Sequence, residues 1–497
     1  MQRTGIKKWL ESTPLFLVLV PLYVLVHLEK VFHHLIVYRY AATQIIILIL
    51  ACLSCYFLAQ FIEKDRRKYW VIAFVLMVFW CYFGLVKNLL EHRYQGYIFS
   101  SYTVLIPFSA IVLAGLIFLI KKLFTKFSRF FLFVNSVWIL FILIDVFSML
   151  LNDIQKPSQE IKYAINLPKT VVADSVKPDI YYIVLDSYSS NVILKLMGSD
   201  NEAIERKLSN KGFRIVNGSC SNYNLTPFSI SSTLNMKYLE EASTEKKYSL
   251  NEFLPGVQLV KYNGLFPWIR QQGYNIVNYS FFDFPENPAN IETHDVWDIE
   301  AIFLQQNAGW KVYRDVSWNF NLPALIGADK IQEAVDLRDV YDDSVYQRLI
   351  STPAIKSSQP RFIYAHFFSP HIPNSRDSIG NKIPVNTKLS VPQEMARYTE
   401  EIKFVNKRID TITNALLENP KRPLVIIIQG DHGYRFYDPQ KTSEEFPNFC
   451  AVYFSNNDYR LLSDTITNVN LFKVVLNTWF NQHIQLDTNR HYFLQYN

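Results

Sequence analysis

The sequence predicts a two-part protein: an α-helical transmembrane bundle followed by an α/β domain whose central, mostly parallel sheet has helices on both faces. Apolar and aromatic residues dominate residues 14–151, where charges form only short clusters. From residue 152 onward, Asp, Glu, Lys, Asn and Pro occur at the frequency of a globular domain. In this second part short apolar runs alternate with helix-like segments, as in α/β sheets. A chain of 497 residues is also too long for one ordinary domain.

Five apolar stretches in the first part are candidates for membrane spans, each of which needs about 20 mostly apolar residues. The first stretch is the shortest, and no small-residue cleavage site of a signal peptide follows it. The stretches are Pro14–Leu28, Thr43–Ile62, Tyr69–Leu90, Tyr102–Ile120 and Phe130–Leu151. We therefore predict a five-helix transmembrane domain over residues 1–151.

The distribution of Lys and Arg predicts the orientation, because basic residues concentrate in cytoplasmic loops. They are frequent before the first stretch and in the loops that follow the second and fourth stretches. The two opposite loops hold only Lys30, Arg39 and Arg93. We expect a cytoplasmic N-terminus and, after five crossings, an extracytoplasmic second part.

Composition argues against two further classes of protein. The net charge of +6 comes largely from the loops between apolar stretches, and no basic run with interleaved aromatics is present, so we expect no nucleic-acid partner. Cys52 and Cys55 form a C-x-x-C, but they lie in an apolar stretch without His or acidic neighbours. We interpret them as small packing residues, not as a redox or zinc pair.

The second part begins after a polar segment with scattered prolines, residues 152–177, which we interpret as a linker. The α/β domain is then predicted over residues 178–497, with a helix at Tyr398–Leu417 among its helical segments. Its predicted strands are Asp179–Leu185, Tyr274–Tyr279, Arg361–Phe367, Pro423–Ile428 and Ala451–Ser455.

Metal-capable side chains follow several of these strands, at the edge of the sheet where ligands bind in α/β folds. Asp186 follows the first strand, and Asp431 and His432 follow the strand near residue 428. Asp186 alone is a weak signal, because strands commonly end where polar loops begin. The Asp-His pair is stronger, since it stands between Gly430 and Gly433, which permit close backbone approach. A polar turn with an incidental His is the alternative.

Four motifs in order resemble the sulfatase-like branch of the alkaline phosphatase superfamily: VLDSYSS, SNYNLTPFSISSTLNM, AHFFSPH and IIIQGDHGYR. Within this branch the chain resembles membrane-anchored bacterial enzymes, the lipoteichoic acid synthases and lipid A phosphoethanolamine transferases. These also place five membrane helices before an extracytoplasmic catalytic domain. The resemblance implies an alkaline-phosphatase/sulfatase-like fold for residues 178–497, in the periplasm, on a protein of the bacterial cytoplasmic membrane.

The resemblance also implies a divalent metal centre made by Asp186, Thr226, Asp431 and His432, with Thr226 as the nucleophile. Zinc and manganese both suit carboxylate, hydroxyl and imidazole ligands. Pro227 favours a helix that begins at this point, whose N-terminus would attract an anion. Ser229 remains the main rival to Thr226.

His366 and His371 resemble a similarly spaced pair that binds the substrate's phosphate or a second metal in the phosphoethanolamine transferases. We predict catalytic roles for both, because an imidazole can supply the proton that a leaving oxygen needs. Packing is the alternative for each of them. Arg435 follows the Asp-His pair and could hold an anionic oxygen or form an exposed ion pair.

One departure from the family narrows the reaction. True sulfatases form formylglycine within a Cys/Ser-x-Pro-x-Arg signature, but here Leu225 stands two residues before Pro227 and no Arg follows at the required place. This argues against sulfate-ester hydrolysis by that mechanism. The shortage of further His and Asp motifs favours one tightly held metal over two.

The leading hypothesis is a metal-dependent phosphotransferase that moves a phospho-alcohol headgroup, of the phosphoethanolamine or phosphoglycerol type, from a phospholipid to an envelope glycan or lipid. A phosphothreonine intermediate on Thr226 would link the two half-reactions. The membrane anchor favours transfer because it raises the effective concentration of lipid donors. The alternatives are a phosphomonoester, phosphodiester or sulfate-ester hydrolase of the same superfamily, and a non-catalytic membrane binding module.

Overall fold

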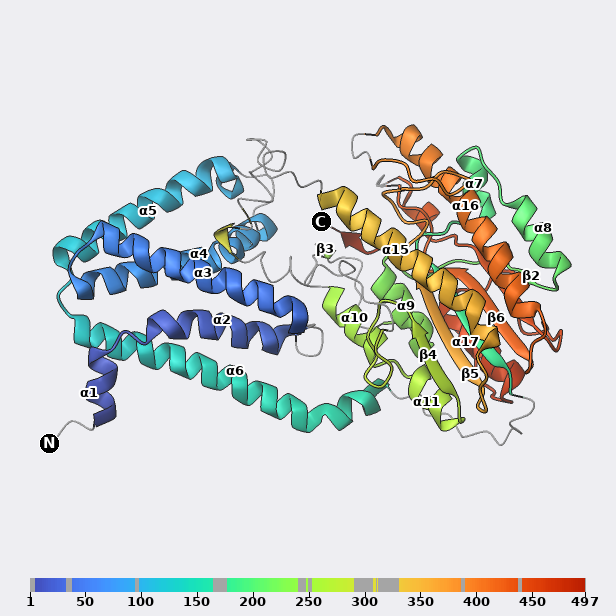
Figure 1. Cartoon of the computed structure of the whole chain (residues 1–497), viewed down its shortest axis with the longest axis horizontal. Helices are drawn as coiled ribbons and strands as arrows, with labels where there is room; N and C mark the ends of the chain where they lie inside the picture. Colours follow the sequence, from blue (N-terminus) through green and yellow to red (C-terminus); the bar gives the residue numbers. More distant parts are fainter. Residues whose placement is uncertain are drawn as a thin grey trace. The chain divides into compact units, whose positions relative to one another are not determined.

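The computed structural model describes residues 5–32, 38–93, 98–163, 177–239, 247–248, 253–289, 307–309, 311, 330–385, 389–436 and 440–496. The chain divides into two compact units, one of residues 1–156 with 297–328 and one of residues 157–296 with 329–497 (Figure 1). Each unit is described below by itself.

The first unit is a helical bundle whose long helices are apolar enough to cross a membrane. They are α2 (Phe16–Phe32), α3 (Tyr38–Ile62), α4 (Arg66–Arg93), α5 (Tyr102–Leu123) and α6 (Phe127–Tyr163), with a short 3₁₀ turn at Ile98–Ser100. Four helices in the described part of the chain pass the test of length and hydropathy alone, and the bent pair of α1 (Gly5–Ser12) and α2 makes a fifth candidate span. The prediction of a membrane bundle is confirmed, but the first span is bent by 93° at its start.

Aromatic side chains fill the interior of this bundle. Phe16 is fully buried and makes edge contacts with Phe74, Phe130 and Phe131. Lipid-facing positions such as Ile111 are exposed in the isolated chain, as expected of a bundle whose outer surface faces hydrocarbon.

The last membrane helix is longer than predicted. The sequence places a linker after residue 151, but α6 continues to Tyr163. Gln, Lys, Glu and Ile make up most of this extension and tolerate a helix, so α6 continues past the apolar stretch even though Pro157 lacks a backbone N–H. The rest of the predicted linker, residues 164–176, lies outside the described residues.

The second unit contains a six-stranded sheet in the order β2-β7-β6-β1-β5-β4. The central strands β6, β1, β5 and β4 are parallel, and β7 runs antiparallel to both of its neighbours. The strands are β1 (Asp179–Leu185), β2 (Arg214–Ile215), β4 (Asn275–Tyr279), β5 (Arg361–Phe367), β6 (Leu424–Gly430) and β7 (Cys450–Phe454). A separate two-stranded sheet pairs β3 (Lys247–Tyr248) with β8 (Gln495–Tyr496). The predicted mostly parallel sheet is confirmed, in mixed form.

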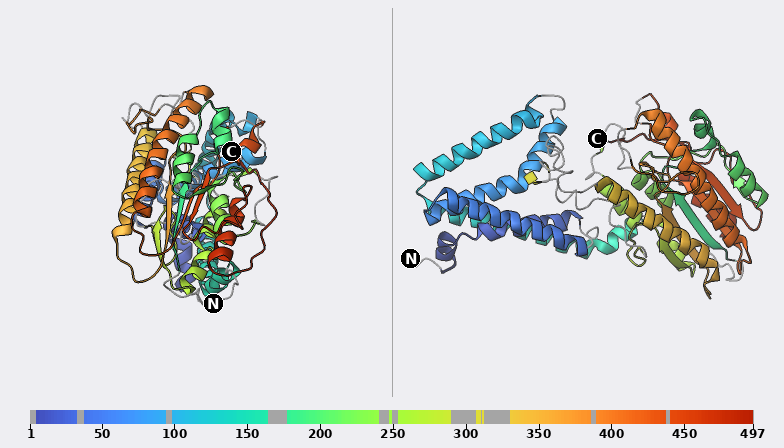
Figure 2. Two further views of the ribbon diagram at one scale, coloured as in Figure 1. Left: turned by 90° about the vertical axis from the view of Figure 1, so that its right-hand side faces the viewer. Right: turned by 45° about the horizontal axis from the view of Figure 1, so that its top comes forward.

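Helices cover both faces of the sheet, as predicted (Figure 2, left). The helices of this unit are α7 (Asn191–Leu196), α8 (Glu202–Asn210), α9 (Thr226–Asn235), α10 (Leu254–Lys261), α11 (Leu265–Gln271), α15 (Lys330–Ser351), α16 (Val391–Leu417) and α17 (Asn468–Trp479), with 3₁₀ turns at Thr352–Ala354 and Thr442–Glu445. On one face Val405 and Ile409 of α16 border the same small cavity as Ile183 of β1. On the other, Phe472 of α17 packs against Tyr182 of β1.

Helix α16 begins at Val391, earlier than the predicted start at Tyr398. Ser390 and Gln393 form a capping box at its N-terminus, and Pro392 occupies the first turn. The Ser-x-x-Gln spacing was a sequence signal for this start, because the two side chains satisfy otherwise free backbone groups.

Candidate active site

Neighbouring parallel strands carry three ligand-type side chains to one edge of the sheet. In the register of β1, Val184 lies opposite His366 of β5 and Leu185 lies opposite Gly430 of β6. Asp186 and Asp431 therefore leave adjacent strands at the same level. One ligand atom from each of Asp186, His366 and Asp431 lies within 4.8 Å of the other two.

Each of these three residues has one buried side-chain atom with no hydrogen-bond partner among the described residues. These atoms are Asp186 Oδ1, Asp431 Oδ2 and His366 Nε2. A buried polar atom without a partner costs about 1–3 kcal/mol, so three around one point need an explanation. A divalent cation supplies one, because carboxylates and imidazoles are its usual ligands. The residues present therefore fit a metal ion.

His432 lies next to this group, and its Nε2 faces the two carboxylates. Its Nε2 is 3.5 Å from Asp186 Oδ1 and 3.6 Å from Asp431 Oδ2. Its Nδ1 lies 2.7 Å from the carbonyl oxygen of Gly433, which can only accept, so Nδ1 carries the proton and Nε2 has the lone pair. His366 Nδ1 lies 2.9 Å from the Tyr364 hydroxyl, which can either donate or accept.

Backbone amides orient Asp431 from behind. Its Oδ1 accepts hydrogen bonds of 2.9 Å from the backbone N–H groups of Ser187 and His432, which leaves Oδ2 for the metal side. Ser187 has a φ of 63°, in the left-handed region that few non-glycine residues adopt, and its hydroxyl donates to the Gly433 carbonyl. Such strain is often held at functional sites.

The two glycines around the Asp-His pair are required by close packing, as the sequence suggested. A Cβ on Gly430 would lie 2.3 Å from the Tyr188 carbonyl oxygen, and one on Gly433 would lie 2.8 Å from the Pro447 carbonyl oxygen. Both neighbours are backbone atoms, so a side chain at either position would displace the loop that holds Asp431.

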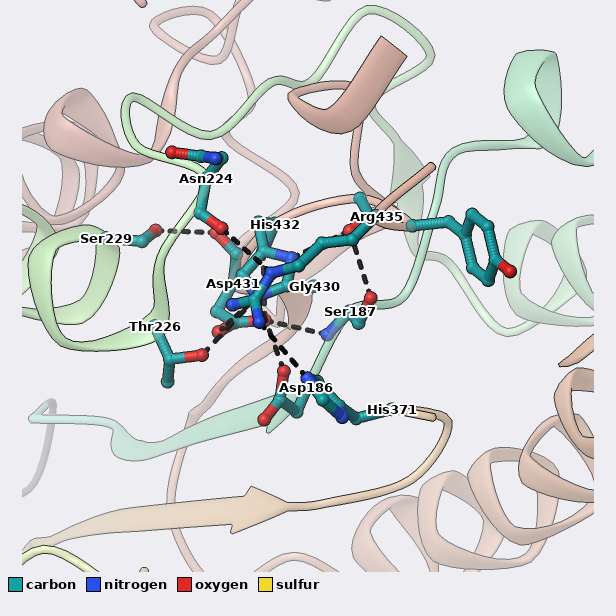
Figure 3. A network of polar contacts seen from close by, with 12 residues as sticks. Asp186, Ser187, Asn224, Thr226, Ser229, His371, Gly430, Asp431, His432 and Arg435 are labelled. Atoms are coloured by element: carbon teal, nitrogen blue, oxygen red, sulfur yellow. Dashed lines mark hydrogen bonds and ion pairs between the residues drawn. The ribbon is translucent and has the colours of Figure 1, made fainter. Parts of the chain in front are cut away.

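Thr226 and its rival Ser229 differ in what their hydroxyls contact. Thr226 is the first residue of α9, and its Oγ1 lies 3.4 Å from His432 Nε2 (Figure 3). The Ser229 hydroxyl instead donates to the Asp431 carbonyl oxygen, at 2.5 Å. Ser229 thus supports the loop of Asp431, while Thr226 faces His432 next to the candidate metal ligands.

Arg435 joins the two histidines on the other side of the cluster (Figure 3). Its Nη2 lies 3.0 Å from His432 Nε2 and its Nη1 lies 3.5 Å from His371 Nε2, while Nε donates to the Asn224 carbonyl oxygen. A guanidinium only donates, so both imidazole nitrogens act as acceptors. Of the two alternatives for Arg435, the structure places it in the site.

Burial determines the charge states of these groups. It raises the pKa of Asp186 well above the ordinary value, and the neighbouring charge of Asp431 raises it further. Burial lowers the pKa of His366 to about 4. It also lowers the pKa values of His371 and His432 well below the ordinary value, with Arg435 adding to the effect in both. Neutral imidazoles follow, which is the form that binds metals.

Three further residues support the site and were not predicted from the sequence. Ser187 orients Asp431, and Asn468 donates to the Asp431 carbonyl oxygen at 3.2 Å. Arg338 of α15 donates to the His371 carbonyl oxygen at 3.1 Å and stacks over the Phe368 ring. Ser187 directly follows Asp186, which is a local signal, but Arg338 and Asn468 have no local signal because helices bring them in from distant parts of the chain.

Comparison with known proteins identifies a family for the second part of the chain. Residues 178–493 match a family model described as Sulfatase. The C-terminal periplasmic domain of EptC from Escherichia coli is 12% identical, with 63% of this chain and 86% of that chain covered and a TM-score of 0.37. The soluble domain of lipooligosaccharide phosphoethanolamine transferase A from Neisseria meningitidis is 12% identical, with 62% and 89% covered and a TM-score of 0.38.

A phosphonate monoester hydrolase from Silicibacter pomeroyi is 13% identical, with 63% of this chain and 75% of that chain covered and a TM-score of 0.38. No curated protein sequence matches the chain. Identities and TM-scores this low do not assign a reaction to the site.

Proposed function

The chain belongs to the sulfatase family of the alkaline phosphatase superfamily, and from this premise we propose that it is a metal-dependent phosphotransferase. It would move a phospho-alcohol headgroup, of the phosphoethanolamine or phosphoglycerol type, from a phospholipid to a glycan or lipid of the bacterial envelope. The observation that carries the proposal is the Thr226 hydroxyl next to His432 Nε2, the nitrogen that faces the buried carboxylates of Asp186 and Asp431.

The proposed metal ligands are Asp186, His366, Asp431 and His432, with Thr226 as a further ligand through its hydroxyl. Zinc or manganese suits this donor set. Such an ion lowers the pKa of a coordinated hydroxyl and offsets negative charge on phosphoryl oxygens.

The chain's own residues would carry out a two-step transfer. Thr226 Oγ1 would give its proton to the neutral His371 Nε2 and form a bond to phosphorus, while the bond from phosphorus to the diacylglycerol oxygen breaks and that oxygen takes the proton from His371. An acceptor hydroxyl would then give its proton to His371 and attack the phosphothreonine, and the released Thr226 oxygen would take that proton back. Arg435 would hold the anionic phosphoryl oxygens through both steps, since guanidinium groups pair well with phosphate. The N-terminus of α9 adds a favourable dipole.

The residue at the nucleophile position favours phosphoryl transfer over sulfate-ester hydrolysis. Formylglycine is made from Cys or Ser, and Thr226 is neither, while the required Arg after Pro227 is absent from the sequence. The membrane helices favour a lipid donor, because they keep the domain near lipid substrates. We propose a cytoplasmic N-terminus and a periplasmic catalytic domain over residues 178–497.

The test uses the full-length protein in vesicles that contain a phospholipid with a fluorescent headgroup. Wild type should release diacylglycerol and carry the headgroup phosphate on Thr226, detected by peptide mass spectrometry, whereas Thr226→Ala should do neither. Ser229→Ala is the matched control, because it removes a nearby hydroxyl that we assign to support, and it should keep the covalent adduct.

Two outcomes would change the proposal. Diacylglycerol release with headgroup appearing only in water, even when membrane glycolipids are supplied, would make the protein a hydrolase. An adduct on Ser229, or full turnover by Thr226→Ala, would refute the assigned nucleophile.

A further inference from the structure

The first described helix, α1, has two distinct faces. It comprises Gly5–Ser12, with the sequence GIKKWLES. At 100° per residue Ile6, Trp9 and Leu10 fall within one stripe, while Lys7 and Lys8 flank this stripe on either side. Ile6 is 73% exposed and Trp9 is 53% exposed, and no residue of α1 is buried. In the described part of the chain Ile6 and Trp9 therefore have no cover, while Leu10 is partly covered.

A rigid elbow fixes the direction of α1. The helices α1 and α2 meet at 93° across a short break (Figure 1). The buried amide of Asn135 in α6 binds both sides of this break: its Nδ2 donates to the carbonyl oxygens of Leu10 (2.9 Å) and Thr13 (2.8 Å), and its Oδ1 accepts from Phe16 N–H (2.9 Å). One side chain thus provides hydrogen-bond partners for free backbone groups at the end of α1 and at the start of α2.

The elbow is also anchored by packing. Phe16, whose N–H is held by Asn135, is fully buried among Phe74, Phe130 and Phe131. With α2 alone of this pair crossing the membrane, a helix held at 93° to it runs close to the membrane plane. The apolar stripe of α1 is then available to the bilayer surface.

We propose that α1 is an interfacial anchor that binds the anionic lipid surface on the N-terminal side of the membrane. Ile6, Trp9 and Leu10 would enter the boundary between headgroups and acyl chains, as amphipathic helices do. Trp prefers this depth, since its ring is apolar and its N–H is polar. Lys7 and Lys8, on the flanks, would reach the lipid phosphates.

This inference does not depend on the proposed phosphotransfer, nor on which side of the membrane the N-terminus lies. Continuity with a membrane-spanning helix favours lipid as the partner, because the bilayer surface lies next to the elbow wherever α2 enters it. The flanking lysines add charge complementarity to anionic headgroups.

The experiment measures the tryptophan emission of Trp9 in vesicles. The full-length protein and Trp9→Phe are reconstituted in phosphatidylcholine, with or without phosphatidylglycerol, and the difference between their spectra gives the Trp9 signal. Phospholipids brominated at shallow or deep acyl carbons report depth, and iodide on both sides of the bilayer reports exposure to water. We expect about two-fold stronger quenching by shallow than by deep bromines, and protection from iodide.

Two further variants test the role of the lysines and the role of the Asn135 hydrogen bonds separately. Lys7→Ala with Lys8→Ala should weaken the quenching by brominated lipid in anionic vesicles only. Asn135→Leu removes three hydrogen bonds while it keeps the side-chain volume similar, and it should lower the anisotropy of the Trp9 signal by freeing the elbow.

Two results for the wild-type protein would refute the proposal. A Trp9 signal that iodide quenches and bromines do not would place α1 in water. A signal protected from both quenchers would mean that a protein surface covers the stripe. Each result refutes lipid as the partner without affecting the proposed enzyme activity.

Discussion

Arg435 Nη2 lies 3.0 Å from His432 Nε2, the same nitrogen that faces both Asp186 and Asp431. A lone pair cannot accept from a guanidinium and coordinate a cation at once. A cation at His432 would therefore release the Arg435 guanidinium, which could then pair with an anionic phosphoryl oxygen. This relation connects the metal ligands with the substrate-binding side of the site.

The first prediction concerns Arg435. Arg435→Ala should lower kcat/KM about 100-fold, because it removes a donor aimed at developing phosphoryl charge. Arg435→Lys should recover only part of the loss, since Lys lacks the planar fork. Steady-state kinetics and metal content are measured together, and the metal content should stay at the wild-type level. Unchanged kinetics for Arg435→Ala would exclude Arg435 from the reaction.

The second prediction separates the two histidines of the AHFFSPH motif. His366→Gln should lower metal affinity by about 10-fold or more, because it replaces a buried imidazole whose Nε2 has no other partner. His371→Gln should keep the metal and lose turnover, since His371 contacts Arg435 instead of the carboxylates. Metal retained after dialysis is quantified by mass spectrometry. Equal metal loss in both variants would contradict this division.

Metal removal gives the third prediction. A cation bound only to the native state stabilises that state, so a chelator should lower the Tm of the wild-type protein. The Tm of Asp431→Asn should respond much less, because one of the buried unpaired oxygens is then an uncharged amide. Thermal unfolding with and without chelator measures both. A wild-type Tm that does not respond to chelation would argue against a metal at this site.

The fourth prediction concerns pH and Glu401 of α16. Burial raises the pKa of Glu401 to about 7 from an ordinary 4.5, although the Ser375 N–H donates to it at 3.0 Å. Between these values the folded state binds more protons than the unfolded state, so the free energy of unfolding falls as pH rises. The decrease amounts to roughly 3 kcal/mol between about pH 4.5 and 7 and ends above that range.

Glu401→Gln should remove this part of the pH dependence, because the amide does not titrate. Urea unfolding of both proteins at several pH values gives the comparison, and the difference between variant and wild type should grow with pH up to about 7. A constant difference across this range would show that Glu401 does not titrate with a raised pKa.

The fifth prediction concerns the glycine before Asp431. Gly430→Ala should destabilise the α/β domain by more than about 3 kcal/mol, because its Cβ would meet the Tyr188 carbonyl oxygen at 2.3 Å. The matched control is Gly273→Ala: Gly273 has a φ of +85° but nothing within 4 Å of the added Cβ. It should cost only about 1–2 kcal/mol of backbone strain. Similar losses in the two variants would mean that the close approach at Gly430 is not limiting.

Local patterns in the sequence were sufficient for much of the fold. Apolar length predicted the membrane helices, and β-branched runs predicted the central strands. The first span and the linker were predicted less well. The elbow before Phe16 depends on Asn135, which is distant in sequence, and α6 extends through polar residues that the change in composition suggested were a linker.

The sequence by itself determined which side chains lie at or near the ends of the central strands. Asp186, His366, Asp431 and His432 lie there because the apolar runs that form β1, β5 and β6 end at these residues in the sequence. Only the tertiary structure decided which of their atoms lie unpaired around one point, since that depends on the register between strands. It also decided that the Ser229 hydroxyl is held by the Asp431 carbonyl while Thr226 faces His432. Hydrogen bonding between distant segments is a long-range property, and local patterns do not encode it.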